Sequence, residues 1–137
     1  DPTLALRHSK CLSADVNAAM DPTFQDVMER KNASFLNYGV VVTKYTGARG
    51  KSSTSDASAE YVAEVRALLD RENIVWQMGE MGKVDIGGGG TVAMFVANMG
   101  VDVVDLGVPV LSMHAPFETT AKFDVYMCYR AMYEFMK

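Results

Sequence analysis

The order of the elements expected along the chain predicts an α/β protein, built as a sheet with helices packed against it. Tyr38 to Lys44, YGVVVTK, is rich in β-branched residues and bounded by turn residues, which predicts a strand. Residues 56–72 carry apolar side chains at helical spacing, which predicts a helix that Ser55 or Asp56 caps. Such strand–loop–helix units bury a sheet between helices. The 137 residues contain no internal repeat or linker and suit one domain or part of a larger one.

The other elements follow from local patterns. Residues 10–16 alternate in period two, and residues 74–78 form a short apolar run, so both predict strands. Residues 24–37 are charged and weakly periodic, which indicates a surface excursion with one helical turn. The polar residues 45–55 favour a long binding loop. Residues 91–99 predict a buried helix, and Thr119 or Thr120 is expected to cap a C-terminal helix whose apolar stripe is Phe123, Tyr126, Met127, Tyr133 and Met136.

Composition excludes several classes of function. Apolar residues make up 49% and charged residues 22%, as in folded globular proteins. A net charge of -4 without a Lys/Arg cluster argues against a nucleic-acid partner. No apolar run approaches the ~20 residues of a membrane helix, and the first residues do not resemble a signal peptide. Cys11 and Cys128 lack Cys-x-x-Cys spacing, so two free thiols in a reducing cytoplasm are expected.

Two residues near the ends of apolar runs are candidates for chemistry. Val101 to Glu118 reads VDVVDLGVPVLSMHAPFE, in which Pro116 forces a turn just past His114. Asp15 lies at the end of the strand expected at residues 10–16. Because ligands of open α/β sheets gather at the carboxyl ends of strands, both side chains should face one cleft. A carboxylate and an imidazole suit zinc, but two ligands are too few for a catalytic zinc. Alternatively, Asp15 caps a turn and His114 packs in a loop.

Four consecutive glycines precede Thr91. Glycines there allow backbone N–H groups to approach an anion or a peptide carbonyl, or they simply allow a tight turn into a helix. No Gly-Lys-Ser/Thr follows, so the run is not a P-loop, and Val92 stands where a dinucleotide-binding pattern needs glycine. The sequence leaves the ligand-binding and structural interpretations of this run equally open.

Three motifs together resemble a known family. SADVNAAMDP around Asp15, KVDIGGGGT from Lys83 to Thr91, and DLGVPVLSMHAPFE around His114 resemble the aminopeptidase I/aspartyl aminopeptidase family of zinc exopeptidases, its bacterial branch most of all. They occur in the family's order and at about its spacing. The resemblance implies a three-layer α/β/α zinc-peptidase catalytic domain, with residues 1–137 as its C-terminal portion. The N-terminal portion and an inserted dimerisation domain would be absent from these residues.

The resemblance also implies site residues. Asp15 would bind one metal of a zinc pair and His114 the other, with other divalent metals as alternatives to zinc. The remaining ligands and the general-base glutamate would lie upstream, so none of the 137 residues is expected to be the catalytic base. The two ions would share a water with a lowered pKa. Gly88, Gly89, Gly90 and Thr91 would line the substrate pocket, where backbone N–H groups meet substrate oxygens.

The expected function is removal of N-terminal amino acids from peptides by a cytoplasmic, zinc-dependent homo-oligomer, which the resemblance implies is a large tetrahedral assembly. Lys44 resembles a family lysine that pairs with an acidic side chain of the substrate; a solvated lysine at a strand end is the alternative. Ala18 replaces the histidine of aspartyl-preferring members, which argues against an acidic preference. The competing hypotheses are a non-catalytic assembly or regulatory domain of the same fold and a small-ligand domain built on the glycine run.

Overall fold

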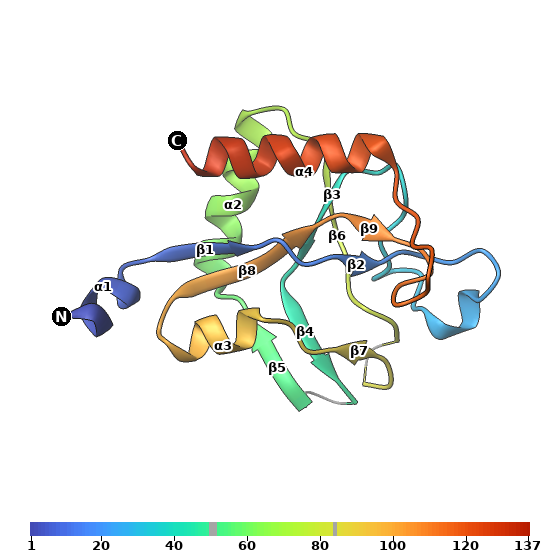
Figure 1. The fold of residues 1–137 in the computed structure, drawn as a ribbon, viewed down its shortest axis with the longest axis horizontal. Coiled ribbons are helices and arrows are strands. Elements are labelled where there is room, and N and C mark those ends of the chain that lie inside the picture. The colour runs from blue at the N-terminus through green and yellow to red at the C-terminus, as the bar shows by residue number, and fades with distance from the viewer. Residues whose placement is uncertain (50–51, 84) are drawn as a thin grey trace.

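The protein is organised around a four-stranded mixed sheet with the strand order β1-β8-β3-β6 (Figure 1). The computed structural model describes residues 1–49, 52–83 and 85–137. β1 pairs in parallel with β8, and β3 in parallel with β6, whereas β3 and β8 run antiparallel and join the two pairs. The four strands are β1 (Lys10–Ser13), β8 (Asp102–Gly107), β3 (Val40–Thr43) and β6 (Trp76–Met78).

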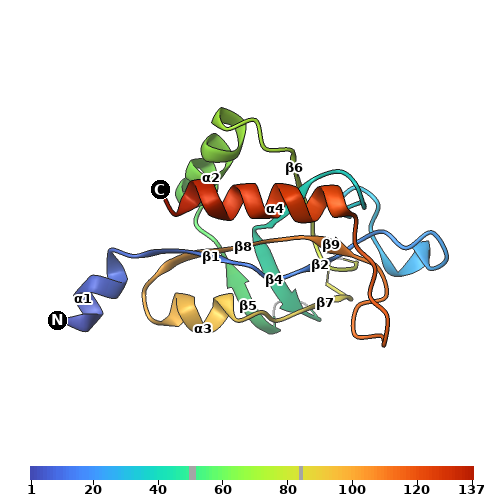
Figure 2. The same ribbon diagram turned by 45° about the horizontal axis from the view of Figure 1, so that its top comes forward.

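Helices cover both faces of this sheet, as Figure 2 shows. α2 (Ala59–Arg71) and α4 (Lys122–Phe135) lie on one face. α3 (Ala93–Asn98) lies on the other face, beside a small sheet of order β5-β4-β7. This arrangement confirms the predicted α/β class with helices on both sides of a sheet. The remaining elements are α1 (Pro2–Arg7), β2 (Asn17–Ala18), the 3-10 helix η1 (Gln25–Val27), β4 (Tyr45–Ala48), β5 (Ser52–Asp56), β7 (Gly88–Gly89) and β9 (Pro109–Val110).

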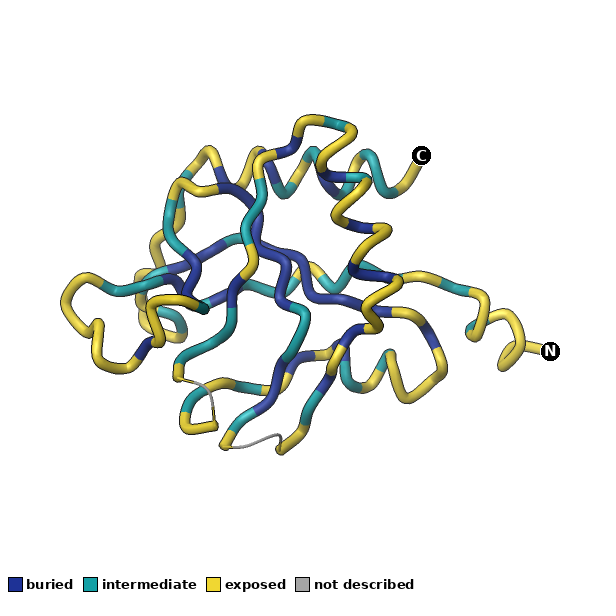
Figure 3. Tube along the Cα trace, turned by 180° about the vertical axis from the view of Figure 1, so that it is seen from behind, coloured by how far each residue is buried: buried dark blue, intermediate teal, exposed yellow. Residues whose placement is uncertain are grey.

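The hydrophobic core lies between the main sheet and the layer formed by α2 and α4. Alternation along the strands selects the side chains that face it, because successive residues of a strand point to opposite faces. Figure 3 shows the buried stretches along the central strands. Each fully buried aliphatic side chain contributes about 1.5–3 kcal/mol. The cluster includes Val40, Val42, Val104 and Leu106 from the sheet, Tyr61, Val65 and Leu69 from α2, and Met127 and Ala131 from α4.

Two helices begin later than the sequence predicts. β5 continues through Asp56, so α2 begins after Ser58, whose hydroxyl accepts a hydrogen bond from the N–H of Tyr61 at 3.2 Å. The predicted capping residue, Ser55 or Asp56, was therefore wrong. Thr119 and Thr120 do not cap α4 either. Thr119 pairs with Leu111, and the Thr120 hydroxyl donates to the Pro109 carbonyl at 2.8 Å.

The predicted binding loop at residues 45–55 is instead part of a β-structure. Its described residues form β4 and β5, which pair antiparallel; Gly50 and Lys51 lie outside the described residues. The sequence of this segment is rich in Ser, Thr and Gly, which masks the strand pattern. The expectation of one helical turn within residues 24–37 is confirmed by η1.

The predicted buried helix at residues 91–99 is also wrong in extent and in burial. α3 has six residues, and only Ala93 among them is buried, while Phe95 is 63% exposed.

The C-terminal helix was predicted correctly, but its apolar stripe mostly faces outward. Met127 is buried, whereas Tyr126, Tyr129 and Tyr133 are exposed. Their rings follow one another along α4, with Tyr126 stacked on Tyr129 at 6.3 Å between centroids and Tyr133 tilted against Tyr129 at 6.1 Å. None of the described helices has the length and hydropathy needed to cross a membrane.

One buried carboxylate ties α4 to the entrance of β3. Asp124, in the first turn of α4, is fully buried and accepts hydrogen bonds from the backbone N–H groups of Asn37 at 2.7 Å and Gly39 at 2.8 Å. Hydrogen bonds to an ionised acceptor are stronger than neutral ones, and a helix N-terminus favours negative charge. Asp124 therefore positions both the helix and the central strand.

We predict that Asp124→Ala lowers the free energy of unfolding by about 2–4 kcal/mol, because the N–H groups of Asn37 and Gly39 lose their fully buried acceptor. Urea denaturation followed through the single tryptophan, Trp76, measures the change. Glu60→Ala is the matched control, since Glu60 is an exposed acidic residue in the first turn of α2. It should cost less than about 0.5 kcal/mol. Equal shifts in the two variants would contradict the role given to Asp124.

Candidate metal and substrate site

Parallel strand pairing brings the two candidate metal ligands to one edge. β1 and β8 pair in the register Lys10↔Asp102 through Ser13↔Asp105, and β2 and β9 continue the parallel pairing beyond them. Asp15 lies between β1 and β2, and His114 follows β9. Both residues line one cleft, together with Val27, Met28, Met81, Gly88, Gly89, Gly90, Thr91 and Glu118. The predicted placement of Asp15 and His114 at one cleft is confirmed, whereas their role as metal ligands stays a prediction.

The sequence suggested that His114 lies directly at a strand end, but the residue sits in a tight loop. β9 ends at Val110, and the backbone of His114 adopts a left-handed conformation with φ 67°. Its N–H donates a hydrogen bond to Oε1 of Glu118 at 2.6 Å. The residue is exposed, and its imidazole forms no hydrogen bond or ion pair with the described residues. Glu118, which the sequence reasoning did not place in the site, therefore holds the loop that carries the imidazole.

Asp15 is fixed by its neighbours in a different way. Its Oδ1 accepts a hydrogen bond from the N–H of Val16 at 2.8 Å, and the side chain is half-buried. Gly107, the last residue of β8, approaches the Asp15 backbone so closely that a Cβ on Gly107 would lie 1.8 Å from the Asp15 carbonyl oxygen. Only glycine permits this approach. Gly107 thereby sets the position of Asp15 against the strand that leads to His114.

A buried carboxylate, Asp105, supports the cleft from inside the fold. It lies opposite Ser13 in β1 and Thr43 in β3, and its Oδ2 accepts a hydrogen bond from the Thr91 hydroxyl at 2.8 Å. Its Oδ1 has no hydrogen-bond partner among the described residues. Burial raises the pKa of Asp105, the charge of Asp15 raises it further, and the hydroxyls of Ser13 and Thr91 oppose the shift. The Thr91 hydroxyl thus donates its hydrogen bond to Asp105, although Thr91 also lines the cleft.

The glycine run forms a strand and does not open a helix. Gly88 and Gly89 pair antiparallel with Ala48 and Gly47 of β4, which fixes one side of their backbone. Gly88 has φ 98°, and a Cβ there would lie 2.0 Å from the Gly47 carbonyl oxygen. Val84, within the KVDIGGGGT motif, lies outside the described residues. The structure therefore supports both interpretations of the glycines, because close strand packing requires them and the strand lines the cleft.

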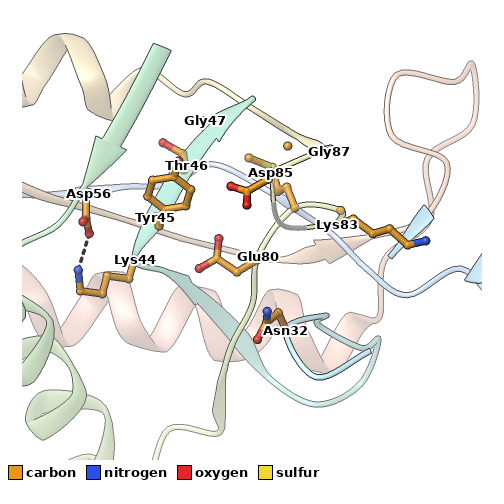
Figure 4. Close-up of a pocket in the computed structure, with 13 residues that line it drawn as sticks. Asn32, Lys44, Tyr45, Thr46, Gly47, Asp56, Glu80, Lys83, Asp85 and Gly87 are labelled. Carbon is orange, nitrogen blue, oxygen red and sulfur yellow. Dashed lines mark hydrogen bonds and ion pairs between the residues drawn. The ribbon is translucent and has the colours of Figure 1, made fainter. Parts of the chain in front are cut away.

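Lys44 does not line the cleft of Asp15 and His114; it lines an adjoining cavity of about 350 Å³ (Figure 4). Lys44 follows β3 and forms an ion pair with Asp56 at the end of β5. Glu80, which follows β6, also lines this cavity. Burial raises the pKa of Glu80 to about 6, with a further rise from Asp56 and an opposing effect of Lys44. The cavity and the cleft share the wall formed by Met81, Gly82 and Gly88.

The described residues do not form a complete metal site by themselves. A catalytic zinc usually has three protein ligands and an open position for water. Within residues 1–49, 52–83 and 85–137, no group of three His, Cys, Asp or Glu side chains is arranged to hold a metal ion. Asp15 and His114 have the right chemistry but need further ligands. The fold and the cleft define an α/β domain in which a carboxylate and an imidazole line the same cleft.

Comparison with known proteins gives the family. The sequence model of the aminopeptidase I zinc metalloprotease (M18) family matches residues 2–136, and the chain belongs to this family. A probable M18 family aminopeptidase 1 of Clostridium acetobutylicum is 52% identical over 122 residues, which are 89% of this chain and 26% of that one. An M18-family aminopeptidase structure from Thermotoga maritima has a TM-score of 0.95 and 47% identity, over 99% of this chain and 30% of its own.

A more distant solved structure, the S. cerevisiae mApe1 dodecamer, has a TM-score of 0.77 and 23% identity over 99% of this chain and 28% of its own, and shows the common fold alone. The chain thus spans less than a third of the length of these relatives.

We predict that Gly107→Ala destabilises the protein by about 1–3 kcal/mol or more, because the new methyl group overlaps the Asp15 carbonyl and forces β1 and β8 apart. Gly89→Ala is the control, since a Cβ at Gly89 would meet no atom within 4 Å, and it should change stability by about 0.5 kcal/mol or less. Thermal unfolding of the two variants compares them directly. A Gly107→Ala protein as stable as Gly89→Ala would show that the close approach is not required.

Proposed function

We propose that residues 1–137 form the C-terminal portion of the catalytic domain of a longer zinc aminopeptidase, which removes N-terminal amino acids from peptides. The observation that carries this proposal is the single cleft shared by Asp15 and His114, two metal-type ligands that come from distant parts of the chain. Membership of the M18 family supports zinc as the metal, with other divalent ions as alternatives. The N-terminal portion and an inserted dimerisation domain would supply the rest of the molecule.

In this proposal each candidate ligand serves a different ion. Asp15 would bind one metal of the pair and His114 the other, and the remaining ligands and the general-base glutamate would come from the rest of the longer chain. When bound, the metals would lower the pKa of a shared water and polarise the scissile carbonyl. The chain's own contribution is to orient the ligands: Glu118 holds the loop of His114, and Gly107 sets the position of Asp15.

The glycine strand would line the place where the peptide binds. Gly88, Gly89, Gly90 and Thr91 belong to the lining of the cleft. The Thr91–Asp105 hydrogen bond anchors the end of this strand to β8 and limits its movement. A rigid wall of backbone groups favours a fixed orientation of an extended substrate, because positioning lowers the entropic part of the barrier.

The runner-up proposal is a non-catalytic assembly or regulatory domain that retains this fold. It is favoured by the incomplete ligand set and by the exposed tyrosines of α4, which suit a contact with another subunit. Assembly and catalysis are compatible. We therefore include a homo-oligomer of the longer protein, acting in the cytoplasm where Cys11 and Cys128 stay reduced, in the main proposal.

We predict that the 137-residue chain alone does not bind zinc with micromolar affinity and does not hydrolyse aminoacyl-nitroanilides, whereas the longer protein does both. The reason is ligand count, since one protein ligand per ion leaves most of the coordination to water. Calorimetric zinc titration and a nitroanilide assay measure the two properties. In the longer protein, Asp15→Ala and His114→Ala should each abolish activity. His8→Ala, at the other, exposed histidine, should leave activity unchanged.

Two results would contradict this account. Micromolar zinc binding by the 137-residue chain, lost in both Asp15→Ala and His114→Ala, would show that it builds its own site. A longer protein that keeps full activity after both substitutions would show that the cleft is not the metal site.

A further inference from the structure

We infer that Asp56 is a specificity-determining residue, which neutralises Lys44 so that the cavity beside the cleft rejects an acidic N-terminal side chain and accepts a neutral or basic one. The inference rests on the proposed aminopeptidase function and adds the substrate class. Its basis is the ion pair of Lys44 with Asp56 in the lining of a cavity that adjoins the cleft of Asp15 and His114.

The cavity lies where the side chain of an N-terminal residue would have to fit. Hydrolysis of the first peptide bond would take place in the cleft, so the side chain of the N-terminal residue needs an adjoining space. The cavity of about 350 Å³ meets this condition, because Met81, Gly82 and Gly88 line both it and the cleft. The volume is within the usual range of small-molecule sites.

The charged groups that face the cavity are mostly acidic. Lys44 is its main candidate for binding an acidic side chain, but Asp56 already pairs with it, as the dashed line in Figure 4 shows. Figure 4 also shows the carboxylates of Glu80 and Asp85 directed toward the cavity, whereas the amine of Lys83 points away. An incoming carboxylate would therefore meet one neutralised cation and two further acidic groups.

The surroundings of Glu80 also disfavour negative charge. Glu80 is half-buried, and its carboxylate has no hydrogen bond or ion pair with the described residues. Burial raises the pKa of Glu80 to about 6, Asp56 adds to the rise, and Lys44 opposes it. The charge of Lys44, already paired with Asp56, thus does not offset the effect of burial on the pKa of Glu80. The cavity therefore favours a cation or a neutral group over an anion.

The strength of the pair sets the size of the expected effect. The Lys44 and Asp56 side chains are 35% and 58% exposed, so solvent and salt screen the interaction. Removing the Asp56 charge should change the discrimination between acidic and neutral substrates by about two- to fivefold, and the change should shrink at high salt.

The test uses the longer zinc-loaded enzyme and the kcat/KM values for Leu-, Lys- and Glu-4-nitroanilide. We expect the wild-type enzyme to prefer Leu and Lys over Glu. Asp56→Asn should raise the Glu/Leu ratio about two- to fivefold and lower the Lys/Leu ratio. Adding Lys44→Met to Asp56→Asn should remove the gain. Glu64→Gln is the matched control, because the Lys10–Glu64 pair is similarly exposed and lines neither the cavity nor the cleft.

Three outcomes would overturn the inference. The Glu/Leu ratio could stay within twofold of wild type, Glu64→Gln could shift it equally, or the shift could appear with dipeptides that vary the second residue instead of the first. If the wild-type enzyme hydrolyses Leu- and Lys-4-nitroanilide and Asp56→Asn has no effect, the inference fails and the proposed function stands. If it hydrolyses none of the substrates, the proposed function fails and the inference falls with it.

Discussion

The parallel pairing of β1 with β8 is the interaction on which the site depends. It aligns two strands from opposite ends of the sequence so that both run toward the same edge of the sheet. The short pair of β2 and β9 then carries both segments past that edge in the same direction. Asp15 and His114 meet at one cleft because of this register, and a shift by one residue would turn the side chains of a strand to the opposite face.

The pairing of these strands brings backbones into close contact and buries a carboxyl group. Gly107 allows the backbone of β8 to pass against Asp15, and Gly88 allows β7 to pass against β4. Asp105 occupies the centre of the sheet between Ser13 and Thr43, where burial disfavours its ionised form. A buried polar group with an unpartnered oxygen is costly, and such groups concentrate where a fold supports a functional site. Its hydrogen bond to Thr91 connects the central sheet to the wall of the cleft.

The sequence predicted the parts that depend on strong local patterns. The β-branched run that became β3, the periodic run that became α2, and the strand-end placement of Asp15 each follow from spacing. The pairing of β4 with β5 and β7 could not be predicted, because Ser, Thr and Gly carry weak strand signals and the partners are set by tertiary contacts. The hydrogen bond between Glu118 and the His114 backbone could not be predicted for a related reason: it depends on the left-handed turn at His114, which sequence spacing does not reveal. The ion pair of Lys44 with Asp56 connects the residue before β4 to the end of β5, and the pairing of β4 with β5 was not foreseen.

The central claim is that this chain contributes Asp15 and His114 to the metal centre of a longer M18 enzyme. Anomalous diffraction at the zinc edge, from crystals of that zinc-loaded enzyme, tests it most directly. The account predicts two anomalous peaks, one within about 2.0–2.2 Å of a carboxylate oxygen of Asp15 and the other within the same distance of an imidazole nitrogen of His114. Zinc peaks whose ligands include neither residue would contradict it.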